Sequence, residues 1–326
     1  MTSVSVAMAT LDGERHLVAQ LESIARQTLL PAELVVCDDG STDGTLELLE
    51  SFAAGAEFPV RLHRNERRLG VGDNFLRAAS LCTGALVAFA DQDDVWLEEK
   101  LARSTQALEA PGVRLCIHAC TVVDQELLPF GRAVPDIRRA RVAEPLEPPR
   151  WGQAPGMAMT FDRELLTLFP AERRPRAHHA HGRLLHDEWI YGLARLAGRI
   201  AFLPDQLVLY RQHEVNVEGA PNQGLRRRLL DAATVGWDYY RRRAEQARDW
   251  AELLAGGRFE AEGAGWQRLA ARLKARAEVY RPDAGRRTRA AALARALAAG
   301  TYGPRGREGF GVRGLVRDTT LAAMRA

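Results

Sequence analysis

The first 125 residues alternate short apolar runs with segments whose apolar residues recur at helical spacing. The apolar runs have strand length, and the stretch after the first of them carries Leu17, Leu21 and Ile24 on one helical face. Regular alternation of strand and helix builds parallel sheets, because parallel neighbours need a crossover connection. The pattern therefore predicts an α/β fold with a mostly parallel, doubly wound sheet. Its predicted strands cover residues 4–8, 33–37, 60–63, 85–90 and 113–123.

The later part of the chain changes character twice. Five prolines fall within residues 135–156, which predicts a long surface loop. A second α/β portion runs to residue 220, and Arg and Ala dominate from there on. Apolar residues at helical spacing then predict an amphipathic helix that includes Leu229, Ala233, Trp237 and Tyr240. We expect an α/β domain over residues 1–220 and a helical C-terminal extension over 221–326.

The charge is distributed unevenly between these two parts. Residues 221–326 contain 22 basic and 11 acidic residues, whereas residues 1–220 contain 23 basic and 31 acidic ones. The basic region is either a solvated helical domain or a surface for peripheral docking on anionic lipid, where each basic residue adds about 1 kcal/mol. It carries no nucleic-acid recognition motif, so we expect no nucleic-acid partner.

No apolar run approaches the roughly 18 residues that a membrane helix needs, and the N-terminus lacks a basic signal-peptide region. We therefore expect a cytoplasmic protein, with peripheral contact to the inner membrane face if the basic region docks there. The four cysteines have no metal-type spacing, which predicts reduced, packed thiols.

Carboxylates follow directly on two of the predicted strands. Asp38 and Asp39 come after the second strand, and residues 91–94 place three aspartates in four positions after the fourth. Ligands bind outside the carboxyl ends of strands in an open parallel sheet, so we expect both groups at one edge. Crowded like charges need compensation, which Mg²⁺ or Mn²⁺ with a diphosphate supplies. The alternative is that these aspartates only cap turns and helices.

Five ordered segments resemble the family 2 glycosyltransferases, whose nucleotide-binding half has the GT-A fold. The opening reads VSVAMATLDGERHLVAQLESIARQTLLPAELVVCDDGSTDGT, and a segment from Asn65 to Asn74 leads to the Asp-x-Asp pair Asp91 and Asp93. The later segments read GMAMTFDRELL, LLHDEWI and LVLYRQHEVNVEG, in that order. The resemblance covers residues 3–219. The wording DQDDVW and YRQHxxN is most similar to the rhamnosyltransferase-like branch.

The resemblance implies a nucleotide-binding half over residues 1–125 and an acceptor and catalytic half over 150–220. In that reading Asp39 accepts the N3–H of a pyrimidine base. Asp93 is the direct ligand of Mn²⁺ or Mg²⁺, and Asp91 and His213 complete the implied metal site. The nucleotide-sugar-binding residues implied by the resemblance are Ala9, Thr10, Asp12, Asp39, Gly72, Asn74, Asp91 and Arg211. Of these, Arg211 would donate hydrogen bonds to the phosphates.

For catalysis, the resemblance implies one carboxylate that takes the proton of the acceptor hydroxyl, because an inverting transfer needs a general base. The family pattern places an acidic residue before an aromatic one, and Asp187 fits it. Glu188 is the alternative base, since both precede Trp189. Asp94 is expected to cap a helix that starts at Trp96, where negative charge is favourable.

The implied function is metal-dependent, inverting transfer of a sugar from a nucleotide-diphosphate donor to a glycan or a lipid-linked glycan. On the resemblance we favour dTDP-rhamnose as donor, with UDP-sugars second. The alternatives are a sugar-phosphate nucleotidyltransferase and a catalytically inactive binding protein of the same fold. Four histidines between 178 and 186 are expected in an acceptor-side loop, a transition-metal site being the alternative; they are His178, His179, His181 and His186.

Overall fold

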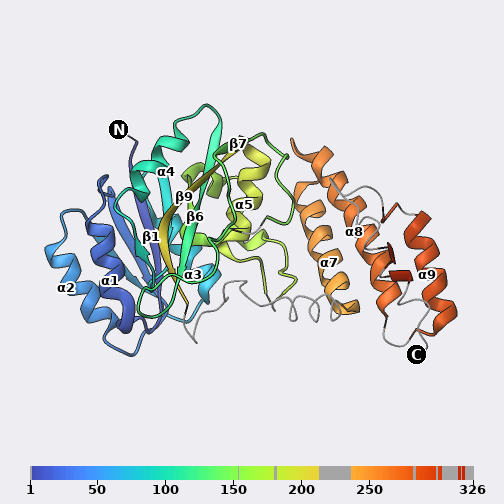
Figure 1. Cartoon of the computed structure of the whole chain (residues 1–326), viewed down its shortest axis with the longest axis horizontal. Coiled ribbons are helices and arrows are strands. Elements are labelled where there is room, and N and C mark those ends of the chain that lie inside the picture. The colour runs from blue at the N-terminus through green and yellow to red at the C-terminus, as the bar shows by residue number, and fades with distance from the viewer. Residues whose placement is uncertain are drawn as a thin grey trace. The chain divides into compact units, whose positions relative to one another are not determined.

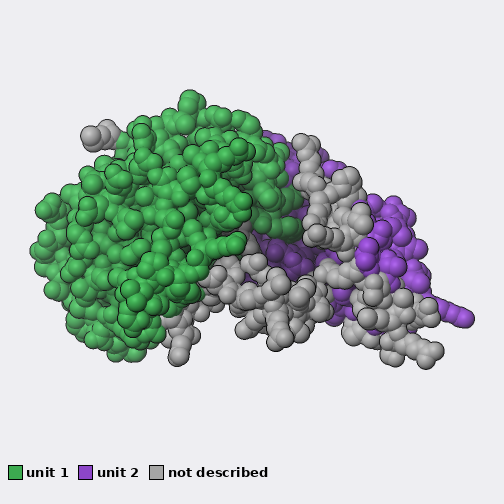
Figure 2. All heavy atoms as spheres, in the orientation of Figure 1, with its two compact units in different colours: residues 1–171, 185–222 green, residues 172–184, 223–326 purple. Residues whose placement is uncertain are grey.

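A computed structural model of the chain describes residues 2–152, 154–179, 182–212, 236–281, 284–298, 300–302, 315–316 and 318–319. The chain forms two compact units (Figure 2). The first comprises residues 1–171 and 185–222, and the second comprises residues 172–184 and 223–326. The segment 172–184 thus belongs to the helical unit, although its sequence lies inside the α/β part.

Strands and helices alternate along the first unit (Figure 1), as the sequence pattern predicts. The strands are β1 (Val4–Thr10), β2 (Glu33–Asp38), β3 (Val60–Arg64), β4 (Leu86–Ala90), β5 (Val95–Trp96), β6 (Val113–Val123), β7 (Arg141–Ala143), β8 (Met159–Asp162) and β9 (Arg199–Arg211). The helices are α1 (Glu14–Ala25), α2 (Thr45–Gly55), α3 (Val71–Leu81), α4 (Lys100–Leu108) and α5 (His186–Ala197), with short 3-10 turns at Gly156–Ala158 and Arg163–Thr167.

In the described part of the chain, nine strands form one mixed sheet in the order β3-β2-β1-β4-β8-β6-β9-β5, with β7 beside β9. The β3-β2-β1-β4 portion is parallel throughout. Strand β8 runs antiparallel to β4 and β6, and β6 and β9 are parallel. This is the expected α/β sheet of GT-A type, with the antiparallel strand β8 inserted between its two parallel parts.

The order of the first four strands creates a switch point beside β1. The chain passes from β1 to β2 and β3 on one side, and then returns to place β4 on the other side. Because the crossovers are right-handed, this reversal puts α3 on the opposite face of the sheet from α1 and α2. A crevice is therefore expected at the carboxyl ends of β1 and β4, the usual place for a ligand in such sheets.

The apolar runs found in the sequence are the central strands of this sheet. Every residue of β1, β2 and β4 is buried, as expected for strands covered on both faces. The predicted helical face of Leu17, Leu21 and Ile24 is also buried, at 2% exposure or less. All four cysteines are free and buried, as packed thiols should be.

The prediction of a helix that starts at Trp96 is wrong. Val95 and Trp96 form the short strand β5, which pairs antiparallel with β9, and the Leu97 backbone N–H still donates to the Leu207 carbonyl at 2.9 Å. Helix α4 begins only at Lys100. The ladder with β9 holds this stretch extended and so overrides its local helical pattern. Likewise, the loop predicted over residues 135–156 contains β7, which pairs with β9.

The second unit contains the helices α7 (Trp237–Leu254), α8 (Glu260–Tyr280) and α9 (Arg286–Ala298). Helices α7 and α8 pack through stacked indoles of Trp250 and Trp266, whose ring centroids are 5.5 Å apart. The C-terminal region is therefore helical, as predicted. Leu229 and Ala233, which we placed on its first helix, lie outside the described residues. None of the helices in the described ranges is both long and apolar enough to cross a membrane.

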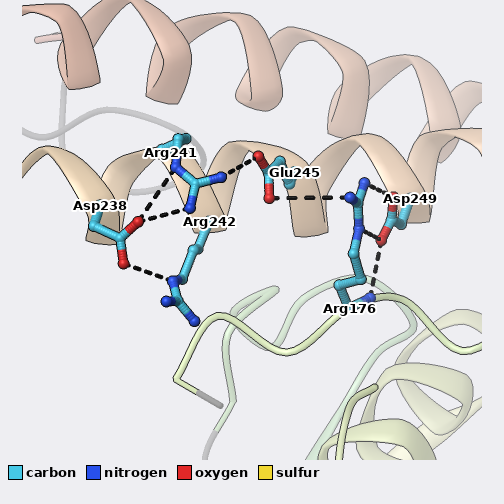
Figure 3. A network of polar contacts seen from close by, with 6 residues as sticks. All are labelled: Arg176, Asp238, Arg241, Arg242, Glu245 and Asp249. Carbon is cyan, nitrogen blue, oxygen red and sulfur yellow. Dashed lines mark hydrogen bonds and ion pairs between the residues drawn. The ribbon is translucent and has the colours of Figure 1, made fainter. Parts of the chain in front are cut away.

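Part of the positive charge of this unit is neutralised within α7. Arg241 and Arg242 both bind Asp238, at 2.7 and 2.6 Å, and Arg241 also binds Glu245 at 2.6 Å (Figure 3). Arg243 is 8% exposed and donates to Gln246. The run Arg226–Arg228 lies outside the described residues. The arginine run at 241–243 is thus an internal network of this helix as well as a source of surface charge.

A bidentate ion pair ties the segment 172–184 to α7 (Figure 3). The Arg176 guanidinium donates to both carboxylate oxygens of Asp249, at 2.9 and 2.7 Å, and the Arg176 backbone N–H donates to the same carboxylate at 2.9 Å. Glu245 lies 4.0 Å from the same guanidinium. Because one carboxylate binds both backbone and side chain, Asp249 holds the segment in one conformation against the helix.

We expect Asp249→Ala to speed hydrogen exchange at the Arg176 backbone amide about fivefold, because charged hydrogen bonds that are partly open to solvent contribute about 1 kcal/mol. Hydrogen-exchange mass spectrometry of the segment 172–184 measures it. Glu252→Ala is the matched control, since Glu252 lies on the same helix and lines the same surface hollow as Arg176 and Asp249. Equal exchange rates in the two variants would contradict the assigned role of Asp249.

Candidate active site

Asp38, the last residue of β2, organises the turn that follows it. Its Oδ1 accepts the backbone N–H groups of Gly40 and Ser41 at 3.1 and 2.9 Å. Its Oδ2 accepts the hydroxyls of Thr10, at 3.0 Å, and of Ser41. Ala9 and Thr10, predicted to contact the nucleotide, end β1 at this point and are 8% and 1% exposed. The Thr10 side chain is therefore directed to the β2 turn.

The next carboxylate, Asp39, reaches in another direction. Its Oδ1 accepts the Asn65 side-chain amide at 2.8 Å and the Leu69 backbone N–H at 2.7 Å, and its Oδ2 accepts the Gly70 backbone N–H at 2.8 Å. Gly70 has a φ of 86°, a left-handed conformation that glycine adopts without strain. Asp39 thus shapes the loop before α3, at the place where a nucleotide base was predicted.

Asn74, in the first turns of α3, joins this loop to β2. Its Nδ2 donates to the Cys37 carbonyl at 2.9 Å, and its Oδ1 accepts from Asn65 at 2.8 Å. Asn65 in turn donates to Asp39, so one polar chain runs from α3 to the β2 end. The motif from Asn65 to Asn74 predicts no role for Asn65 itself, and the sequence signal for one is its position directly after β3.

Asp12 and Gly72, both predicted to contact the donor, lie in the loop after β1 and in the first turn of α3. Asp12 has a φ of 45°, and its Oδ1 accepts the Thr42 backbone N–H at 2.8 Å, which links the loop after β1 to the turn after β2. A Cβ at Gly72 would lie 3.3 Å from the Leu185 side chain and 3.4 Å from its backbone. Glycine at this position lets α3 approach the residue that precedes α5.

The acidic stretch at residues 91–94 begins where β4 ends, as predicted, and only some of its side chains are in the crevice. Asp91 and Asp93 are partly exposed, whereas Asp94 is fully buried. Asp94 caps no helix at Trp96; its Oδ1 accepts the Arg211 backbone N–H at 3.0 Å. Burial, with Asp93 and Asp91 adding negative charge, raises the pKa of Asp94 well above its usual range.

Asp187 stands in the first turn of α5 and is partly exposed. The preceding residue, His186, anchors this turn: its ring stacks on Phe75 with a centroid distance of 4.0 Å and meets the edge of Phe89 at 4.7 Å. The Asp187 carboxylate also accepts the Glu188 backbone N–H at 2.7 Å. Aromatic packing onto α3 and β4 therefore fixes where the Asp187 side chain emerges.

The three carboxylates Asp91, Asp93 and Asp187 act on one another. Desolvation of its half-buried side chain, and then the negative charges of Asp93 and Asp187, raise the pKa of Asp91 to about 8. His186, the neighbour of Asp187, packs against Phe89, two residues before Asp91, so the two acidic segments lie close together although they are distant in sequence. The strand end of β4 and the N-terminus of α5 thus form one acidic site.

Arg211, at the end of β9, lies beneath the acidic loop. Its Nε donates to the Asp93 carbonyl at 2.8 Å, and its Nη1 donates to the Gln125 carbonyl. The side chain is buried, with 4% exposure. His213, predicted as a metal ligand, lies outside the described residues. Gln92, for which the sequence predicts no role, forms two hydrogen bonds to the backbone of Leu11.

A separate hollow of about 760 Å³ lies within the helical unit, and its lining includes none of these carboxylates. Its lining includes Arg176, Arg241 and Arg242, and these arginines bind Asp249, Asp238 and Glu245. Mutual neutralisation of this kind makes the hollow a feature of the ion-pair network of that unit. The crevice at the strand ends remains the candidate active site.

Comparison with known proteins agrees with the fold. The sequence profile described as Glycosyl transferase family 2 matches residues 5–166. A dTDP-rhamnosyl transferase, RfbG, from Shigella flexneri is 27% identical over 218 residues, covering 65% of this chain and 74% of the relative. An uncharacterized glycosyltransferase from Nostoc is 26% identical, covering 65% of this chain and 66% of that protein.

Among solved structures, Staphylococcus aureus TarS residues 1–349 in complex with UDP-GlcNAc superposes with a TM-score of 0.58. The sequences are 19% identical, and the match covers 91% of this chain and 81% of the other. At that level of identity the similarity establishes the fold, and the chemistry has to come from the residues at the strand ends.

Proposed function

Residues 5–166 of this chain are a glycosyl transferase family 2 domain, and on that basis we propose that the protein is a metal-dependent, inverting glycosyltransferase. Its donor is a sugar linked to a nucleoside diphosphate, and its acceptor is a glycan or a lipid-linked glycan. One observation carries the proposal: His186 packs against Phe89 of β4 and so brings the first turn of α5, with Asp187, to the strand end that carries Asp91 and Asp93.

The acidic loop fits a divalent cation. Asp91 and Asp93 offer the carboxylate oxygens that Mn²⁺ and Mg²⁺ bind, and desolvation together with the charge of Asp93 raises the pKa of Asp91. A cation held by Asp93 and Asp91 would neutralise the charge that develops on the departing diphosphate. These are the metal ligands that the resemblance implies, apart from His213.

Asp187 is the proposed general base. It accepts the proton of the acceptor hydroxyl while the acceptor oxygen bonds to the anomeric carbon of the donor sugar. The bond between that carbon and the diphosphate oxygen breaks, and the nucleoside diphosphate departs with the electron pair. Attack opposite to the leaving group inverts the anomeric configuration. Anchoring of His186 between Phe75 and Phe89 holds Asp187 at this place.

The donor base is proposed to be a pyrimidine. A carboxylate offers about four acceptor positions, and the bonds from Asn65, Leu69 and Gly70 occupy three of those of Asp39. The remaining position can accept the N3–H of uracil or thymine, whereas the N3 of cytosine carries a lone pair. The names of two similar proteins support this choice, because one uses a dTDP-linked sugar and the other was solved with UDP-GlcNAc.

We therefore expect dTDP and UDP to bind more tightly than GDP or CDP. A calorimetric screen of dTDP-, UDP-, GDP- and CDP-sugars with Mn²⁺ present measures the order, and dTDP-rhamnose is the first donor to try. Asp39→Asn is the companion variant: its amide cannot accept from Leu69 and Gly70 as the carboxylate does, so the preference for pyrimidines should shrink. Tighter binding of GDP or CDP by the unaltered protein would contradict the proposed donor class.

A further inference from the structure

The side chains of the acidic loop, residues 91–94, alternate between two roles. Asp91 and Asp93 belong to the acidic site, whereas Gln92 and Asp94 make their hydrogen bonds to the protein backbone. Residues 92 and 93 form a turn, and the loop directs these two pairs of side chains to different partners. The second and fourth positions of the loop, together with Arg211, are therefore available to hold the first and third in place.

On one flank, Gln92 pairs with the loop after β1. Its Oε1 accepts the Leu11 backbone N–H at 2.9 Å, and its Nε2 donates to the Leu11 carbonyl at 3.0 Å. A side chain at Gly13 would overlap the Gln92 amide, so glycine there makes room for it. This pair of bonds fastens the acidic loop to the strand end that borders the crevice.

On the other flank, Asp94 and Arg211, the last residue of β9, join the acidic loop to the ends of β6 and β9. The Asp94 carboxylate accepts the Arg211 backbone N–H, and the Arg211 Nε donates to the Asp93 carbonyl at 2.8 Å. The same guanidinium donates to the Gln125 carbonyl just after β6. Two carbonyls from different segments are thus held by one planar, rigid group, which a lysine ammonium cannot imitate.

We infer that Gln92 and Arg211 are positioning residues that clamp the acidic loop, so that Asp91 and Asp93 are already placed together before a cation binds. Without the clamp, mutual repulsion of the carboxylates favours a loop that opens and separates them. This inference rests on the proposed metal-dependent function. It gives Arg211 a role on the backbone of the loop, where the sequence suggested a direct contact to the donor phosphates.

The test compares UDP affinity with Mn²⁺ and with EDTA in the full-length protein, for Arg211→Lys and Gln92→Met. Loss of an outer-shell partner of a metal site typically costs about 10- to 100-fold in metal affinity or activity. We expect the Mn²⁺-dependent part of UDP affinity to fall by about that factor in both variants, and UDP affinity in EDTA to stay unchanged. Arg103→Lys and Gln106→Met, exposed residues of α4, are the matched controls.

The outcomes separate the roles. A fall of UDP affinity in EDTA for Arg211→Lys alone would make Arg211 a phosphate contact and overturn the inference, as would unchanged Mn²⁺ dependence in both folded variants. Circular dichroism checks folding, and Gln92→Met alone decides if Arg211→Lys does not fold. If the unaltered protein binds UDP equally with Mn²⁺ and EDTA, the proposed metal dependence fails instead. Direct titration of Mn²⁺ without UDP gives a second readout that does not depend on activity.

Discussion

Asp187→Asn is expected to lower sugar transfer by about 10²- to 10⁴-fold, the usual contribution of a positioned general base. The substitution keeps the shape of the side chain and the oxygen that can accept the Glu188 backbone N–H. It removes the group that takes the proton from the acceptor. Donor binding should change little, because the proposed role of Asp187 lies in the reaction of the acceptor. Steady-state kinetics with a saturating donor, and calorimetry for donor affinity, measure the two effects separately.

Glu188→Gln is the matched control for this prediction. Glu188 is the next residue on α5 and carries the same charge, so it reports the effect of removing a carboxylate from that turn. The carboxylate that shifts the pKa of Asp91 is that of Asp187. Near-normal transfer in Asp187→Asn, combined with a large loss in Glu188→Gln, would identify Glu188 as the base. Equal small losses in both would speak against either carboxylate as base.

Asp93→Ala is expected to remove the metal dependence of donor binding, so that donor affinity with Mn²⁺ falls to the value with EDTA. The side chain is the proposed direct ligand, and the bond from Arg211 goes to the backbone carbonyl, which the substitution retains. The loop should therefore keep its conformation while it loses one ligand. Calorimetric titration of the donor with and without chelator measures this effect.

A surface aspartate provides the control for Asp93→Ala. Asp136 lies in the loop after β6 and is paired with Arg138 at 3.3 Å, with 60% of its side chain exposed. Asp136→Ala should leave donor affinity and its Mn²⁺ dependence as they are in the unaltered protein. Donor affinity that still responds to Mn²⁺ in Asp93→Ala would mean that this carboxylate is no metal ligand.

Much of the sheet could be predicted because its central strands are buried on both faces. Residues 4–8, 33–37 and 85–90 are mostly apolar runs, and each marks a central strand in the structure. The stretch at 95–97 shows the limit of such patterns. Its apolar residues fit a helix equally well, and the partner that makes it a strand, β9, is over a hundred residues away in the chain.

Adjacent carboxylates show a second limit. Asp38 and Asp39 look equivalent in the sequence, since both follow β2. In the structure Asp38 closes its own turn, whereas Asp39 reaches the loop at residues 65–70.

Lys100 is a stronger example of what sequence patterns miss. It is fully buried, with its Nζ 3.7 Å above the Trp96 ring, and burial lowers its pKa to about 7. Composition and spacing give no sign of a buried lysine.

By itself the sequence determined which strands end in carboxylates, because apolar runs mark the buried strands and the aspartates follow those runs directly. It also determined that these ends meet at one edge, because parallel strands deliver their carboxyl ends together. Only the tertiary structure decided which side chains enter the crevice. The convergence of Asp91 with Asp187 and the use of Arg211 on the loop backbone depend on packing between distant segments. Local pattern carries no information on such contacts, since they form only when the sheet and α5 come together.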